Sequence, residues 1–141
     1  MCSNFVLCIS LNIFANYGFI FFPFSLSFLD TSGNYHHDSK AFLFSLVNNP
    51  GWAPLKLPQT GKYSSYSRSI RCHSVLGPTF GGGFDISIYN NARSNINTYS
   101  NLGHTYSPPS GYSYGSTFAH TFLAGTYKFT PDQVETFYET T

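Results

Sequence analysis

The chain has 141 residues, a formal net charge of +1 and only 9% charged residues, against about 25% in typical globular domains. Its only close basic pair, Arg68 and Arg71, falls short of the basic stripe that nucleic-acid binding requires. Aromatic residues make up 19% of the sequence, with 15 Phe and 11 Tyr, and this enrichment favours β-strands within a single domain.

Residues 1–29 contain no charged residue and are long enough for a membrane span, which needs about 20 predominantly apolar residues. Asn4, Asn12 and Asn16 interrupt this stretch, and Pro23 would break a helical hydrogen-bond ladder. No Lys or Arg precedes the apolar run, so the basic region of a secretory signal is missing as well. A membrane anchor is one interpretation of this segment, although the segment makes a poor span.

Five short segments have the apolar and aromatic patterns of β-strands and are separated by clusters of Gly, Ser, Asn and Pro. The expected strands are residues 41–47, 69–75, 84–89, 125–129 and 134–138. A short helical turn is expected at residues 116–122, where Phe118 and Phe122 lie one turn apart. The spacing of these elements resembles that of a sandwich of antiparallel strands.

Residues 76–89 read LGPTFGGGFDISIY and join a glycine-rich turn to an alternating pattern. Glycines allow a positive φ or the close approach of another chain segment, and we expect one or both here. A phosphate-binding loop is disfavoured, because no Lys-Ser/Thr pair follows the glycines and no G-x-G-x-x-G opens a helix. Residues 84–89 alternate apolar and polar side chains, as a half-buried strand does.

The glycine turn and its neighbours are the candidate site. The candidate structural or partner-binding residues are Gly77, Pro78, Phe80, Gly81, Gly82, Gly83 and Asp85. We expect the Asp85 carboxylate to accept hydrogen bonds from loop amides and to fix the turn. A positive φ at Gly82 would make a β-branched replacement at that position damaging to folding or partner binding.

Groups that could carry catalysis are few and badly spaced. Cys2, Cys8 and Cys72 form no C-x-x-C pair, and their odd number argues against a disulfide framework and for a reducing compartment. His36 and His37 precede a strand without a second ligand cluster, which favours solvated side chains over a metal site. We therefore expect no catalytic residue, no metal and no cofactor, with Cys72 as the one thiol candidate for redox chemistry.

Four motifs in order resemble those of the TLDc domain, the module of oxidation-resistance proteins. The central one is GPTFGGGFDI at residues 77–86, and DSKAFLFSL at residues 38–46 resembles the family's D-S-F-I-F-S-L strand with two extra residues after the serine. YSNLGHTY at residues 99–106 and FLAGTYKF at residues 122–129 are similar to two downstream stretches of the family. Four ordered motifs between residues 30 and 141 argue against a chance match.

The resemblance implies a mainly β (α+β) fold, an antiparallel two-sheet β-sandwich with short helices, in which the first part of the domain is missing. It divides the chain into an apolar leader at residues 1–29 and a partial TLDc domain at residues 30–141. The leader then has three interpretations: an incorrect translation start read in frame, a membrane segment, or a strand in which this chain diverges from the family.

The resemblance also implies a non-enzymatic module that takes part in oxidative-stress resistance and binds subunits of the vacuolar proton-pumping ATPase. The expected location is cytoplasmic, with membrane anchoring through residues 1–29 as the alternative. Two other functions remain open, a thiol-dependent antioxidant enzyme that uses Cys72 and a fragment of an adaptor in which a TLDc domain follows a BTB-type domain.

Overall fold

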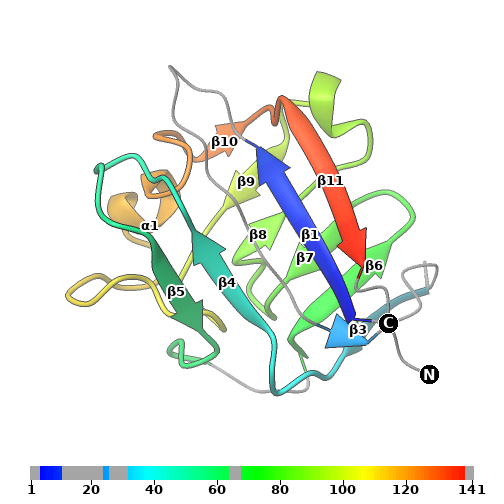
Figure 1. Ribbon diagram of the computed structural model, residues 1–141, viewed down its shortest axis with the longest axis horizontal. Helices are drawn as coiled ribbons and strands as arrows, with labels where there is room; N and C mark the ends of the chain where they lie inside the picture. The colour runs from blue at the N-terminus through cyan, green and yellow to red at the C-terminus, as the bar shows by residue number, and fades with distance from the viewer. Residues whose placement is uncertain (1–3, 11–23, 26–31, 64–67, 139–141) are drawn as a thin grey trace.

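The computed structural model describes residues 4–10, 24–25, 32–63 and 68–138 (Figure 1). Six strands form the largest sheet: β3 (Ser32–His36), β6 (Ile70–His73), β7 (Gly77–Phe80), β8 (Ile86–Ser87), β9 (Thr98–Ser100) and β10 (Lys128–Phe129). Their spatial order is β10-β9-β8-β7-β6-β3, and every neighbouring pair is antiparallel.

A second layer lies over one face of this sheet (Figure 1). In it, β1 (Asn4–Ser10) pairs with β2 (Phe24–Ser25) and with β11 (Gln133–Tyr138), both antiparallel. The strands β4 (Phe42–Ser45) and β5 (Leu55–Pro58) form a two-stranded antiparallel sheet. The predicted mainly β sandwich of antiparallel strands is confirmed.

Each of the five expected strands overlaps an observed one, namely β4, β6, β8, β10 or β11. The expected helical turn contains α1 (Thr117–Thr121), which begins after Ser116, whose hydroxyl accepts a hydrogen bond from the Ala119 N–H at 3.1 Å. A turn of 3-10 helix, η2 (Ala92–Ser94), precedes β9. The sequence did not predict β3, β5, β7 or β9.

The expected half-buried strand after the glycine turn is wrong in two respects. Strand β8 is shorter than expected, and Phe84 has a φ of 57°, a left-handed conformation that ends the glycine turn instead of beginning a strand. Ile86 is buried as expected, but Asp85 and Ser87 on the alternate positions are also shielded from solvent. The segment is therefore buried on both of its faces.

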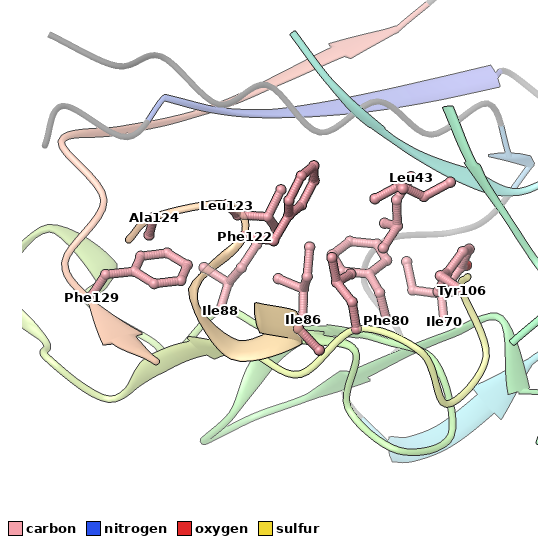
Figure 2. Close-up of a cluster of buried hydrophobic side chains, with 13 residues drawn as sticks. Leu43, Ile70, Phe80, Ile86, Ile88, Tyr106, Phe122, Leu123, Ala124 and Phe129 are labelled. Carbon is pink, nitrogen blue, oxygen red and sulfur yellow. The ribbon is translucent and has the colours of Figure 1, made fainter. Parts of the chain in front are cut away.

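The hydrophobic core lies between the two layers (Figure 2). Phe80 and Ile86 reach it from the six-stranded sheet, and Leu43 reaches it from the opposite layer. The buried cluster consists of Leu43, Leu57, Ile70, Phe80, Ile86, Ile88, Leu102, Tyr106, Ala119, Phe122, Leu123, Ala124 and Phe129. Burial of one large side chain stabilises a fold by about 1.5–3 kcal/mol, so this cluster fixes the sheet that carries the candidate site.

The apolar leader expected at residues 1–29 lies partly outside the described residues. Its described part includes β1, which pairs along its length with β11, with Phe5 opposite Tyr138 and Ser10 opposite Gln133. Across the described ranges, no helix is both long and apolar enough to span a membrane. The membrane segment and the incorrect start remain predictions, as does the division of the chain at residue 30.

Candidate functional site

The carboxylate of Asp85 lies beneath the glycine loop, defined as residues 81–84 between β7 and β8, and it holds a second loop in place. Its Oδ1 accepts hydrogen bonds from the backbone N–H groups of Gly103 (2.9 Å), His104 (3.0 Å) and Tyr106 (3.1 Å). Its Oδ2 accepts one from the Thr105 N–H at 3.0 Å. Bonds from loop amides were predicted, but the donors belong to a loop 18 to 21 residues downstream and not to the glycine turn.

Burial raises the pKa of Asp85 to about 7, and the four backbone N–H groups act in the opposite direction. The side chain is fully shielded from solvent, which disfavours its charged form. Burial, with the Asp85 charge as the second cause, also raises the pKa of Tyr106, whose hydroxyl donates to the Ser69 carbonyl at 2.9 Å. Asp85 is therefore a structural group that changes charge near neutral pH.

The loop that Asp85 holds is also bound on its other side. The Gly61 N–H donates to the Thr105 carbonyl at 2.9 Å, and the Tyr63 N–H donates to the His104 carbonyl at 2.8 Å. A Cβ at Gly61 would lie 2.6 Å from the His104 carbonyl oxygen, so the close approach requires glycine there. Residues 103–106 are thus hydrogen-bonded to residues 61–63 on one side and to Asp85 on the other, next to the glycine loop.

Two glycines of the candidate site adopt the left-handed backbone conformation. Gly77 has a φ of 67°, and a Cβ there would overlap the Ile88 carbonyl oxygen. Gly81 has a φ of 81°, and a Cβ there would overlap the Asp85 carboxylate. Both positions need glycine for conformation and for space, because an L side chain is strained at such φ values.

The other two glycines have a different role. Gly82 and Gly83 lie outside the left-handed range, so the expectation of a positive φ at Gly82 is wrong. A Cβ at Gly83 would overlap the His104 ring, whereas one at Gly82 would lie 2.8 Å from the Arg68 Cδ and 3.2 Å from His104 Cε1. These glycines leave room for two side chains that lie against the loop.

The remaining candidate residues do not reach the surface of the loop. Pro78 lies in β7 opposite Cys72 of β6, and its carbonyl accepts a hydrogen bond from the Ile88 N–H at 2.9 Å. Phe80, at the end of β7, is completely buried in the core. Both are structural residues of the sheet, while Gly82 and Gly83 of the loop are half-buried.

Side chains around the glycine loop are cationic and aromatic. Arg68 is exposed, and the half-buried His104 packs 5.1 Å from the Tyr63 ring and 5.4 Å from the Tyr114 ring, measured between ring centroids. Burial, and then the neighbouring Arg68 charge, lowers the pKa of His104. The pair Arg68 and Arg71 was recognisable in the sequence. Its position beside this loop was not, since the contact is made only in the folded chain.

The other chemical candidates are dispersed in the fold. His37 is exposed and His36 half-buried, while His120 Nε2 lies 2.9 Å from Asn101 Oδ1. The strand position of Cys72 opposite Pro78 is defined, whereas Cys2 lies outside the described residues. Among the residues that the structure describes, no three His, Cys, Asp or Glu side chains gather as metal ligands would.

The site is therefore a glycine loop on a β-sandwich, held from within by a buried carboxylate and bordered by cations and aromatic rings. A family model for the TLDc domain matches residues 3–139. The chain belongs to the TLDc domain family, as its four motifs predicted. No curated protein and no solved structure matches the chain.

Proposed function

We propose that this TLDc domain is a non-enzymatic protein-interaction module, located in the cytoplasm, whose glycine loop contacts a protein partner. The proposed partner is a subunit of the vacuolar proton-pumping ATPase, and the proposed role is in resistance to oxidative stress. Both follow from what TLDc membership implies. The observation that favours a contact surface is the way the loop is held, with four amides on Asp85.

A loop held in this way suits recognition. The Gly82 N–H donates to the Thr105 hydroxyl at 2.9 Å, and the Tyr35 hydroxyl donates to the Gly82 carbonyl at 3.4 Å. The loop backbone is therefore tied to both neighbouring segments before any partner arrives. Association then costs less conformational entropy, and function commonly lies on loops that a rigid scaffold positions.

Capture of vacuolar ATPase subunits on the immobilised chain tests the proposal. Gly82→Gln is the informative variant, because Gly82 lies outside the left-handed region and the atoms nearest to an added Cβ belong to the side chains of Arg68 and His104. Ile96→Gln is the matched control. The Ile96 side chain is 71% exposed and lies between η2 and β9 in the sequence, outside the glycine loop. We expect capture by the wild type and the control and loss of capture by Gly82→Gln at unchanged thermal stability. Absence of capture by the wild type would contradict the proposed partner.

The non-enzymatic part of the proposal has its own test. Peroxide consumption by the purified chain is compared with that of Cys72→Ser, which removes the thiol candidate that the sequence singled out. We expect both proteins to consume peroxide at the same slow rate. Rapid consumption that Cys72→Ser abolishes would instead establish a thiol-dependent enzyme.

A further inference from the structure

A continuous group of cations and aromatic rings surrounds the glycine loop. We call it the basic patch, and its members are Tyr35, Lys62, Tyr63, Arg68, Arg71, Phe84 and His104. Directly paired residues on neighbouring antiparallel strands point to the same face of a sheet, so Tyr35 of β3 and Arg71 of β6 share a face. That face is opposite to the one from which Ile70 and Phe80 enter the core.

Arg71, on this outer face, lies close to two aromatic rings. The centre of its guanidinium lies 5.5 Å from the Tyr35 ring centroid and 5.7 Å from that of Phe84. Aromatic contacts of this kind restrict a planar guanidinium and leave its N–H groups directed along the plane. The Arg71 Nε is shielded from solvent and has no hydrogen-bond partner within the described part of the chain.

The patch continues from Arg71 to the far side of the loop. Arg68 lies 5.9 Å from the same Tyr35 ring and also borders His104, which in turn packs against Tyr63. The Lys62 ammonium lies 5.0 Å from the Tyr63 ring centroid. The cations are thus linked through rings they share.

No ion pair joins these cations to the three acidic side chains that the structure describes, those of Asp38, Asp85 and Asp132. Asp85, the acid beside the glycine loop, is buried and directs its oxygens to backbone amides. We propose that the basic patch docks an acidic segment of a protein partner, with carboxylates of that segment on Arg68 and Arg71. This inference rests on the proposed function as an interaction module and specifies the partner's chemistry.

An acidic peptide fits the patch better than other polyanions do. Arginine presents its N–H groups as a planar fork that matches a carboxylate, and the neighbouring rings can pack apolar side chains of the same segment. Nucleic acids require a longer basic stripe, and membrane-binding polybasic segments carry about 4–8 Lys and Arg. The patch has three such residues, Lys62, Arg68 and Arg71.

Fluorescence anisotropy of the purified full chain with a labelled peptide that carries glutamate at alternate positions tests the inference. We expect saturable binding that weakens with added salt, and no binding of the same peptide with glutamine in place of glutamate. Arg68→Glu should weaken binding about tenfold, because it replaces an exposed attractive charge with a repulsive one. Arg93→Glu, which makes the same change on η2, should leave binding unchanged.

A second variant separates charge from geometry. Arg71→Lys keeps the charge but removes the planar fork, and we expect several-fold weaker binding at an unchanged melting temperature. Should that variant fail to fold, the exposed Arg68 still decides the question. Equal effects of Arg68→Glu and Arg93→Glu would overturn the inference, as would preferential binding to phosphatidylserine vesicles or to single-stranded DNA.

Binding of the acidic peptide and capture of ATPase subunits can each be lost without the other. Absent peptide binding with intact capture of ATPase subunits would overturn the acidic-segment inference and leave the proposed partner standing. Peptide binding that depends on Arg68, without capture of ATPase subunits, would support the inference and contradict the proposed partner.

Discussion

Replacement of Asp85 by Asn should change the pH dependence of stability in a defined direction. Burial raises the pKa of Asp85 to about 7 in the folded chain, roughly three units above its ordinary value. The folded state therefore binds this proton more tightly than the unfolded state does. The stabilisation is fully present below about pH 4 and is lost as the pH rises through about 7.

The size of the effect follows from the shift. One pKa unit corresponds to about 1.4 kcal/mol, so the Asp85 contribution to the free energy of unfolding should fall by about 4 kcal/mol across this window. The side-chain amide introduced by Asp85→Asn would keep an oxygen at the position of Oδ1, which faces all four backbone amides, but would not titrate. The cost of Asp85→Asn should accordingly be larger at acidic pH than at alkaline pH.

Urea unfolding of both proteins at a series of pH values measures this difference. The free energies of unfolding of the two proteins are subtracted at each pH, because His104 has an opposite effect. Its lowered pKa removes stability as the pH falls below about 6.5. Subtraction of the variant's curve removes that contribution. A difference that does not vary with pH, or that grows as the pH rises, would show that the amide hydrogen bonds outweigh burial at Asp85 and would refute the reasoning.

Two further substitutions test how the loop is held. Gly81→Ala should lower the free energy of unfolding more than Gly51→Ala does. Both glycines have a positive φ, but only at Gly81 does a carboxylate lie where the Cβ would be placed. Equal losses of stability in urea unfolding would contradict this expectation. Tyr106→Phe should cost about 1 kcal/mol in the same assay by removing the buried hydrogen bond to the Ser69 carbonyl, and no loss would contradict that role.

Hydrophobic pattern predicted β4 but missed β5, although Leu57 of β5 is buried, and it also missed β7 and β9, which bury small polar side chains. In β4, Leu43 is completely buried, and its apolar surroundings made the strand recognisable. By contrast, Thr79 and Ser87 are buried on neighbouring strands with their hydroxyls 3.2 Å apart, and Ser100 donates to the His120 carbonyl at 3.0 Å. Hydroxyl groups satisfied in this way can be buried without an apolar signal in the sequence.

The candidate site was predictable in its residue types but not in its partners. Asp85 stood out as the lone acid after the glycines, which indicated a hydrogen-bond acceptor. Its donors belong to another loop, and no spacing rule connects the two before the chain folds. Tyr35 and Arg71 meet for the same reason, because the pairing of β3 with β6 brings them together. Local patterns carry information about turns and strands, whereas these contacts depend on the register of distant strands.

The inward direction of Asp85 explains how a chain with a net charge of +1 can present a local excess of cations. If this carboxylate faced solvent from the glycine loop, it would lie near Arg68 and reduce the attraction of the patch for an external acid. Instead its oxygens accept hydrogen bonds from four backbone N–H groups. A Cβ at Gly81 would overlap the carboxylate. The buried Asp85 therefore fixes the loop and leaves the cations beside it without an acidic partner among the described residues. The proposed recognition depends on both effects, the rigidity of the loop and the positive charge of the basic patch.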